Sequence, residues 1–284
     1  NKEVFRQTFA RGVPTSNLEK VGSTPNRRGT TIAFTPDATI FGEDAKFKPA
    51  RLYRLARSKA YLFAGVEIRW KCDPSLISDE TPAEAVFQFP GGLSDHLKEQ
   101  IGTRECATTD FFRGRQDLPH QEGSVEWALA WPLWSEGGSS YYCNTIPTPD
   151  GGTHEQGIRA ALTKGIRAFG ELVGQKKAKD IQADDIVNGA EIMLSVFIRD
   201  PQFQSQTKDR LTSPDAARLV EAAIRDHFDH FLADHMDRGR ALLGFVLDRM
   251  DERLRRKAEG EVKRKTATSS RKLRLPGKLT DCAN

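Results

Sequence analysis

A run of seven residues, 192–198, constrains the fold more than any other part of this 284-residue chain. All of its side chains except Ser195 are apolar, and such a run is typical of a strand that is buried on both faces of a sheet. The dipeptide Asp200-Pro201 follows closely, and because proline lacks a backbone donor it ends strand pairing. The sequence therefore predicts a central strand that leads into a projecting loop.

The loop after this strand carries three polar side chains in succession, Gln206, Thr207 and Lys208. An amide donor, a hydroxyl and a cation so close together are suited to binding a phosphate group. The alternative is a solvated polar loop without a ligand, since loops are polar on average. For an arbitrary sequence this alternative is the more frequent one.

The composition indicates an ordinary globular protein without a strong overall charge. The formal net charge is +4, from 43 basic and 39 acidic residues, so any affinity for nucleic acid must come from local clustering of positive charge. No apolar run approaches the roughly 20 residues that a membrane helix needs, and no signal peptide opens the chain. We therefore expect a cytoplasmic protein that does not contact a membrane. The four cysteines show no C-x-x-C spacing, which argues against a zinc site and a disulfide framework.

The order of expected elements in the first half mixes strands and helices. Alternation and turn residues predict strands at residues 4–9, 29–34, 66–70 and 85–89, and helices at residues 49–61 and 93–101. Residues 103–122 are expected to be irregular. Residues 125–131 and 141–146 are expected to form two neighbouring strands joined through Gly137-Gly138.

The second half is expected to be mainly helical around the central strand. Thr153 is expected to cap a helix, with Gln156 completing a capping box. This helix should bury one apolar stripe, formed by Ile158, Ala161, Leu162, Ile166, Phe169, Leu172 and Val173. Ser213-Pro214-Asp215 should open another helix, and a further helix should follow Gly239. His227 and His230 could reach one metal ion, but phenylalanines fill the face between them, so we expect no metal site.

Four blocks of sequence, in this order, resemble the B subunits of bacterial type II topoisomerases, which are DNA gyrase and topoisomerase IV. The blocks are residues 28–36, residues 144–147 with 151–154, residues 200–211, and residues 275–282. Because they are spread over nearly the whole chain, the resemblance covers more than a single motif.

The resemblance implies an α+β fold in four parts. Residues 1–72 would be the tail of a GHKL-type ATP-binding sheet, and residues 73–213 a transducer domain with a left-handed βαβ crossover like that of a ribosomal-protein domain. Residues 214–265 would be long connecting helices, and residues 266–284 a basic linker into a TOPRIM domain. We find no match to the family's catalytic glutamate, Mg²⁺-binding asparagine or glycine-rich lid, so the isolated chain should not hydrolyse ATP.

The same resemblance implies roles at a nucleotide site. Lys208 would contact the γ-phosphate of ATP, Gln206 would support it, and Thr30 would lie beside the adenine. Most residues that bind ATP and Mg²⁺ would lie outside this chain. From the residues alone, Thr30 is simply a β-branched strand former.

The resemblance also implies residues that face DNA. Arg159 would point into the hole through which DNA passes, and Arg271 and Lys272 belong to a basic run for which contact with DNA phosphates is expected. From the residues alone, Arg159 is equally a solvated helix residue, and a charge run of this kind is usually a solvated tail.

The implied function is that of an ATP-hydrolysing subunit that couples ATP binding and hydrolysis to DNA strand passage, in chromosome decatenation and relaxation. It would form a homodimer through the ATPase region and a heterotetramer with the A subunit, associated with the nucleoid. Residues 65–68, 92–97 and 195–203 are closer to the topoisomerase IV protein than to that of gyrase, which is the alternative. A stand-alone nucleic-acid-binding module is a further alternative, since the transducer fold also occurs in ribosomal proteins and the tail is basic.

Overall fold

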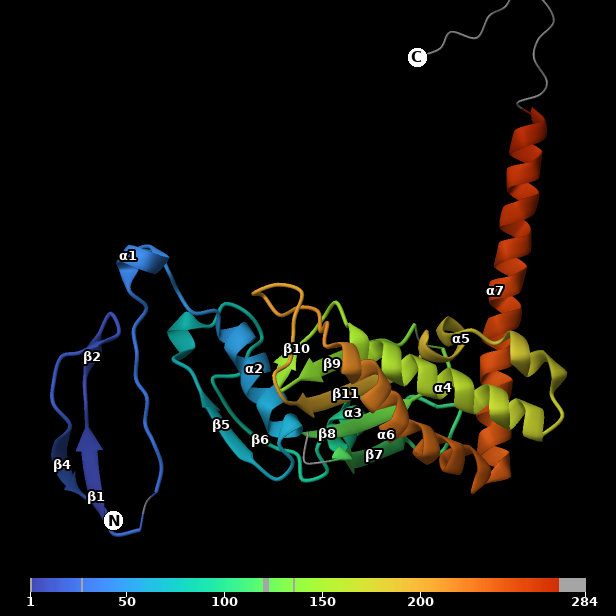
Figure 1. The fold of residues 1–284 in the computed structure, drawn as a ribbon. Coiled ribbons are helices and arrows are strands. Elements are labelled where there is room, and N and C mark those ends of the chain that lie inside the picture. Colours follow the sequence, from blue (N-terminus) through green and yellow to red (C-terminus); the bar gives the residue numbers. More distant parts are fainter. Residues whose placement is uncertain (1, 27, 120–122, 135, 271–284) are drawn as a thin grey trace, which may run out of the picture.

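The computed structural model describes residues 2–26, 28–119, 123–134 and 136–270. Figure 1 shows an elongated molecule, with small strands at the N-terminal end, a five-stranded sheet and its helices in the middle, and helix α7 leaving at the other end. No helix in this described part is long and apolar enough to cross a membrane.

The N-terminal segment forms small two-stranded sheets. Strand β1 (Glu3–Arg6) pairs antiparallel with β4 (Glu19–Ser23), and β2 (Phe9–Ala10) pairs antiparallel with β3 (Val13–Pro14). A short helix, α1 (Ala38–Phe41), follows. The prediction of a strand over residues 29–34 is wrong. This segment pairs with no described strand, and Phe34 is 73 % exposed. A strand needs a neighbour that satisfies its backbone groups, and the alternation of β-branched residues could not supply one.

The next four elements confirm their expected positions to within about two residues. They are α2 (Pro49–Leu62), β5 (Glu67–Lys71), β6 (Glu84–Gln88) and α3 (Leu93–Ile101), with a short 3-10 helix at Pro74–Leu76. Pro49 opens α2 at the first helical position, where its missing N–H costs no hydrogen bond. Strands β5 and β6 pair antiparallel across the predicted domain boundary at residue 72.

The large sheet has the strand order β10-β9-β11-β8-β7. Its strands are β7 (Phe112–Asp117), β8 (Gly123–Ala130), β9 (Gly138–Cys143), β10 (Ile146–Pro147) and β11 (Glu191–Ile198). The predicted central strand is confirmed, because β11 lies in the middle of the sheet and is buried over most of its length. It runs antiparallel to β8 and parallel to β9.

Two expectations about this sheet are wrong. Strands β8 and β9 are not neighbours, because β11 lies between them and pairs with both. A strand that is apolar on both faces is most stable in the middle of a sheet whose two faces are both covered, so β11 lies between the strands of the expected hairpin. Residues 103–122 are also not irregular throughout, because β7 forms there and Phe112 is buried. Most other side chains of β7 are polar, as is common at a sheet edge, so the sequence signal was weak.

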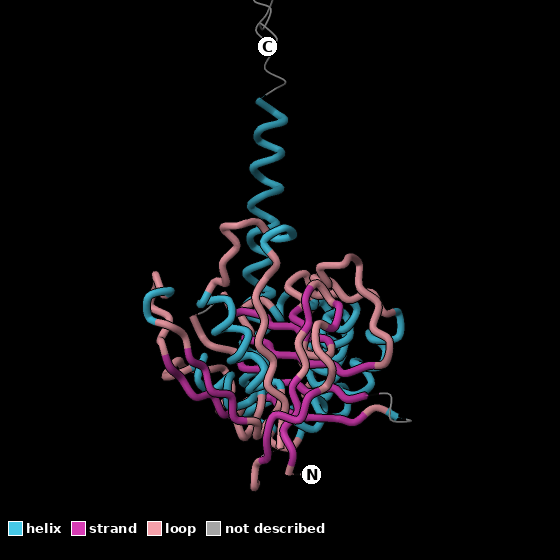
Figure 2. The backbone as a smooth tube through the Cα atoms, turned by 90° about the vertical axis from the view of Figure 1, so that its left-hand side faces the viewer, coloured by secondary structure: helices cyan, strands magenta, loops and turns pink. Residues whose placement is uncertain are grey.

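Helices cover both faces of this sheet (Figures 1 and 2). Helices α4 (Thr153–Leu172) and α6 (Pro214–Ala233) pack on one face, while α2 and α3 pack on the other. Neighbouring residues of β8 face opposite layers, since Leu129 lies in the α4–α6 core and Ala128 in the α2–α3 core. A 3-10 helix (Lys176–Asp180) and α5 (Ala183–Val187) connect α4 to β11. Strand β9, helix α4 and strand β11 therefore form the expected βαβ unit, whose handedness stays a prediction.

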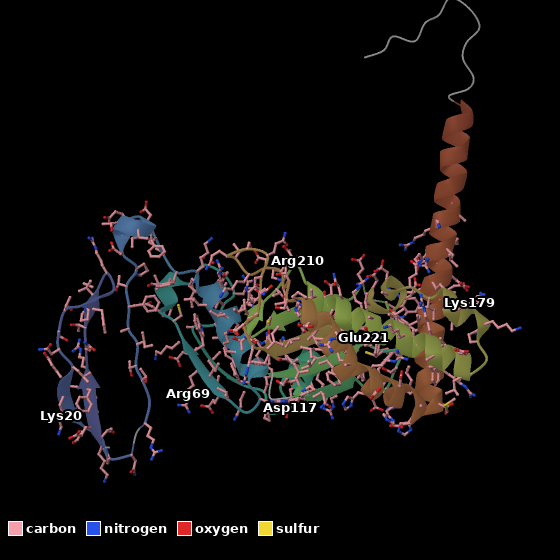
Figure 3. All side chains as sticks on the ribbon, in the orientation of Figure 1. Lys20, Arg69, Asp117, Lys179, Arg210 and Glu221 are labelled. Carbon is pink, nitrogen blue, oxygen red and sulfur yellow. The ribbon has the colours of Figure 1, made fainter. Side chains whose placement is uncertain are left out.

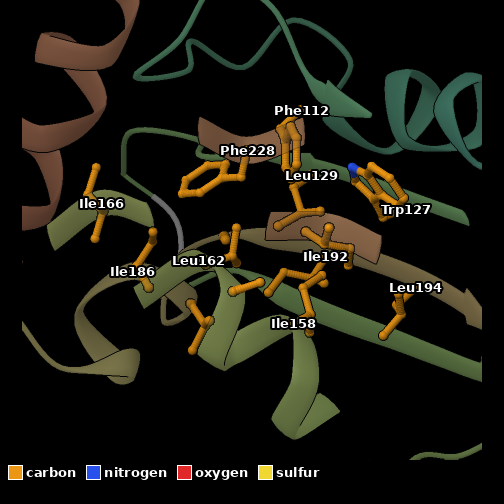
Figure 4. Close-up of a cluster of buried hydrophobic side chains, with 14 of the residues drawn as sticks. Phe112, Trp127, Leu129, Ile158, Leu162, Ile166, Ile186, Ile192, Leu194 and Phe228 are labelled. Atoms are coloured by element: carbon orange, nitrogen blue, oxygen red, sulfur yellow. The ribbon is translucent and has the colours of Figure 1, made fainter. Parts of the chain in front are cut away.

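The apolar stripe of α4 is confirmed except at its end. Ile158, Leu162 and Ile166 are fully buried. Ile158 lies near Ile192 of β11, while Ile166 lies beside Ile186 (Figure 4). Leu172, which we expected on the same stripe, is 69 % exposed. In the last turn the packed side is that of Gly170, against Ala178. Two residues further along an α-helix, Leu172 points to nearly the opposite side.

Helix α7 (Met236–Ser270) begins before Gly239, so the predicted start after this glycine is wrong. A Cβ at Gly239 would lie 2.4 Å from the Leu232 carbonyl oxygen, so glycine permits the close approach of α6 and α7. Further along α7, the Arg253 guanidinium forms two hydrogen bonds, of 2.7 and 2.8 Å, with the buried carboxylate of Asp185 in α5. Beyond this pair the helix extends away from the body of the molecule (Figure 1).

We expect Leu162→Ala to lower the free energy of unfolding by about 2–5 kcal/mol, because it leaves a cavity in the core beneath α4. The matched variant Leu172→Ala, on the same helix, should change it by less than about 0.5 kcal/mol. Urea denaturation followed by tryptophan fluorescence measures both. Equal effects of the two variants would contradict the packing described for α4.

We expect Arg253→Met to lower the free energy of unfolding by about 3–5 kcal/mol, because it leaves the Asp185 carboxylate buried without a cation. Lys177→Met is the control, since it removes the exposed ion pair between Lys177 and Asp251 of α7. It should change the free energy of unfolding by less than about 1 kcal/mol. The same denaturation measurement separates them. A small effect of Arg253→Met would show that α7 is not held by this pair.

Candidate functional site

The loop of residues 200–211 folds back on itself at its root. The backbone N–H of Thr212 donates to the Gln202 carbonyl at 2.8 Å, and that of Gln204 donates to the Arg210 carbonyl at 3.0 Å. The expected helix entry at Ser213-Pro214 is confirmed as the start of α6, but the Ser213 hydroxyl does not cap it. This hydroxyl instead accepts a 2.9 Å hydrogen bond from the Gln202 N–H. The loop root is therefore fixed to the N-cap residue of α6.

The end of the loop is bonded to the N-terminus of α4. Leu211 donates to the Gly151 carbonyl at 3.1 Å and accepts from the Thr153 N–H at 3.1 Å. Between them, Gly152 has a φ of 134° and no room for a side chain, because a Cβ would lie 2.1 Å from the Leu211 carbonyl oxygen. Arg210, labelled in Figure 3, adds a 2.8 Å bond to the Asp150 carbonyl.

This geometry corrects the predicted cap of α4. The N-cap is Gly152, and its N–H lies 3.4 Å from the Glu155 carboxylate, so Thr153 and Gln156 do not form a capping box. The close contact with Leu211 selects glycine at the cap position. A contact with a residue so distant in the sequence left no local signal.

The start of the loop is bonded to the turn between β9 and β10. The side-chain amide of Asn144 accepts from the Ile198 N–H at 3.0 Å and donates to the Ile198 carbonyl at 2.9 Å. Ile198 is the last residue of β11, shortly before the loop. Asn144 thus continues the sheet pairing by one residue through its side chain.

The tip of the loop carries the side chains predicted to bind phosphate. A 3.1 Å bond from the Lys208 N–H to the Ser205 carbonyl closes a turn, on which Gln206 and Thr207 are exposed. Lys208 has a φ of 63° and is half-buried, with its Nζ 5.8 Å from the centre of the Phe203 ring. Among the described residues, no carboxylate lies within ion-pair distance of Lys208.

Thr30 is not brought to this loop. It is exposed, and the segment between β4 and α1 that carries it is separated from the loop in Figure 1. The structure therefore groups Gln206 and Lys208 at one tip and leaves Thr30 apart from them.

Arg159 lies at a surface hollow on the outer face of α4. The hollow has a volume of about 360 Å³ and is lined by Gln156, Arg159, Ala160, Thr163, Lys164, Arg167 and Ala183. Arg159 pairs with Asp184 and, at 3.8 Å, with Glu155, while Lys164 pairs with Glu221, labelled in Figure 3. Arg271 and Lys272 lie outside the described residues.

Among the described histidines, His154 and His227 contact neighbouring protein side chains. His154 is fully buried, with its Nε2 2.9 Å from the Thr148 hydroxyl, and burial lowers its pKa to about 4. The His227 ring contacts Trp127, and its Nε2 lies 3.3 Å from the Gln116 side-chain oxygen. Within residues 2–270, apart from the gaps named above, no group of three or more acidic, cysteine or histidine side chains could hold a metal ion.

Sequence reasoning missed the role of Lys59 near this site. Its Nζ donates to the carbonyl and the hydroxyl oxygen of Thr145, at 2.7 and 2.8 Å. From the sequence, Lys59 is only one of the helically spaced residues of α2. Its partner is 86 positions away in the sequence, so no local pattern could reveal the contact.

Comparison with known proteins places these features in a family. The family model for DNA gyrase B matches residues 92–262, which include α4, the loop and most of α7. The B subunit of DNA topoisomerase 4 from Bartonella bacilliformis is 50 % identical over 99 % of this chain and 41 % of its own length. That of Caulobacter vibrioides is 50 % identical over 98 % of this chain and 40 % of its own length. The chain thus spans about two fifths of these relatives.

A solved structure confirms the expected α+β fold. The 43K ATPase domain of Thermus thermophilus gyrase B, in complex with an aminocoumarin, superposes with a TM-score of 0.70 at 26 % sequence identity. The match covers 92 % of this chain and 69 % of that one. Since the family model also matches more than half of the sequence, the chain belongs to the DNA gyrase B family.

Proposed function

We propose that this chain is the ATPase-tail and transducer part of a topoisomerase IV B subunit. In the whole protein it would couple ATP binding and hydrolysis to DNA strand passage. Identity of 50 % to two topoisomerase 4 B subunits supports this assignment over gyrase. The proposed parts are residues 1–72, 73–213, 214–265 and 266–284, and the β5–β6 hairpin would be a stiff joint between the first two.

The observation that carries the proposal is the contrast between the root and the tip of the loop. The root is bonded to β11, α4 and α6 through Asn144, Leu211 and Ser213. The tip carries Lys208, whose ammonium has no carboxylate partner among the described residues. A rigid root with a free cation at the tip is suited to sensing an anion in a neighbouring domain.

A phosphate would compete with the Phe203 ring for the Lys208 ammonium. A cation over an aromatic ring at an exposed site gains about 0.5–1 kcal/mol, which is the scale for Lys208 over Phe203. A cation about 4 Å from a phosphate charge gains on the order of 4 kcal/mol at an effective dielectric near 20, before desolvation. The γ-phosphate of ATP would compete with Phe203 for Lys208, with Gln206 supporting the contact. Thr30, which lies apart from the loop, would be beside the adenine at the other end of the nucleotide.

Tight packing offers a path from the loop to α7. A Cβ at Gly157 of α4 would lie 2.5 Å from the Ala217 carbonyl oxygen of α6, and one at Gly165 would lie 2.5 Å from the Phe228 ring. Such closely packed helices move as a unit rather than deform. A shift of the loop root would therefore move α4 and α6 together. Helix α5 is joined to α4 by the Arg159–Asp184 pair, and its Asp185 would pass the motion to α7 through Arg253.

The proposed partners are those of the whole protein. ATP and Mg²⁺ would be bound mainly by residues outside this chain, in a homodimer formed through the ATPase region. The protein would act on DNA in a heterotetramer with the A subunit, in the nucleoid. Arg159 would face the passing DNA, and Arg271 and Lys272 would contact DNA phosphates. At Arg159, these phosphates would have to compete with the carboxylates of Glu155 and Asp184.

We expect Lys208→Ala, in the full-length protein assembled with the A subunit, to lower ATP-dependent strand passage by about 10- to 150-fold. This range corresponds to the roughly 1.5–3 kcal/mol of one hydrogen bond to a charged group. Binding of ADP, which lacks the γ-phosphate, should stay within about threefold of the unaltered protein, because Lys208 is not expected to contact it. Relaxation of supercoiled DNA as a function of ATP concentration measures the first quantity.

Lys177→Ala is the matched control, since it removes an exposed lysine outside the loop, whose partner Asp251 is also exposed. Its strand passage should equal that of the unaltered protein. Unchanged relaxation by the Lys208→Ala enzyme would contradict the proposed function. If the isolated chain also bound DNA in a salt-dependent way, a separate nucleic-acid-binding role would be the better account.

A further inference from the structure

The last turn of α2 contacts the strand from which the loop emerges and two elements beside it. Lys59 binds the turn between β9 and β10 through Thr145, and the Tyr61 hydroxyl lies 2.6 Å from that of Tyr142 in β9. The Phe63 ring, at the C-cap of α2, lies 6.0 Å from the Phe197 ring of β11. One end of a helix thus holds β9, β11 and the turn that joins β9 to β10.

The contact of Lys59 is unusual for a lysine. Its Nζ donates to two oxygens of one residue, Thr145, and no carboxylate of the described part of the chain lies within ion-pair distance. Lys59 is half-buried, and burial lowers its pKa. Because Lys59 loses part of its hydration and has no opposite charge nearby among the residues described, its two hydrogen bonds to Thr145 must compensate for the cost of burial.

The turn that Lys59 holds is strained. Asn144 and Thr145 have φ angles of 48° and 66°, a conformation that is uncommon for residues other than glycine and costly for a β-branched threonine. Such a conformation persists only where its surroundings fix it. Here Lys59 binds Thr145 on one side, and the Asn144 amide binds Ile198 on the other.

We infer that Lys59 is a positioning residue that fixes the loop of residues 200–211 relative to α2. It would act through the Asn144-Thr145 turn and Ile198, which is the last residue of the strand before the loop. Its effect on activity rests on the proposed function, because Lys208 can meet a phosphate only if the loop root is correctly placed. Because every contact in this connection joins two protein groups, it would set where Lys208 lies before ATP binds.

A merely stabilising role predicts something different. If Lys59 contributed only to stability, its loss would raise amide exchange throughout the molecule, including in α7. A positioning role confines the change to the amides of Asn144 and Ile198 and to the loop root. These amides donate to the Val196 carbonyl and to the Asn144 side chain, at 2.8 and 3.0 Å.

The test compares Lys59→Met, Lys59→Arg and Lys48→Met in the full-length protein assembled with the A subunit. We expect Lys59→Met to speed amide exchange in peptides covering Asn144 and Ile198 by at least about tenfold, without a change in α7. It should also lower ATP-dependent strand passage by about threefold or more, a smaller loss than that caused by Lys208→Ala, because Lys208 itself is retained. Arginine can donate to both Thr145 oxygens, so Lys59→Arg should recover most of the loss.

Lys48→Met removes an exposed lysine at the other end of α2 and should behave like the unaltered protein. Unchanged exchange at Asn144 and Ile198, or an equal increase in α7, would overturn the inference. Unchanged strand passage would also overturn it, provided that Lys208→Ala lowers strand passage in the same assay. If Lys208→Ala has no effect, the proposed function fails, and the exchange data alone decide the role of Lys59.

Discussion

The contact on which this structure depends is the pairing of Leu211 with the backbone around Gly152. Two hydrogen bonds and the absence of a side chain at Gly152 bring the end of the loop onto the N-terminus of α4. Because these are backbone groups in close contact, the loop root cannot move without α4. Helix α4 in turn lies against α6 and the sheet, so a local event at the loop has a rigid body to act on.

The positions of the charged side chains among the described residues agree with a rigid body on which the loop acts. Arg253 and Lys164 pair with carboxylates across neighbouring elements, which ties helices together. Lys208 and Lys59 differ, since the first lies over an aromatic ring and the second binds two neutral oxygens. An unpaired cation retains most of its capacity to bind an anion, whereas a paired one must first lose its partner.

The sequence predicts the features that follow from local patterns and misses those that depend on distant contacts. The buried run of β11 and the start of α6 at Ser213-Pro214 are recognisable because their signals lie within a few residues. The polar edge strand β7, the insertion of β11 between β8 and β9, and the cap at Gly152 depend on partners far along the chain. At the site, Gln206 and Lys208 are predicted to bind phosphate from the polar residues of the loop and from the family resemblance. The Lys59–Thr145 contact does not, because it joins two proposed domains that are distant in the sequence.

The most direct test of the central claim is amide exchange of residues 200–211 in the full-length protein with either ADP or a non-hydrolysable ATP analogue. If Lys208 senses the γ-phosphate, the analogue should slow exchange at the loop tip and at the Leu211 amide, whereas ADP should not. Replacing Lys208 with alanine should remove the difference between the two nucleotides. Equal protection by ADP and by the analogue in the unaltered protein would contradict the account.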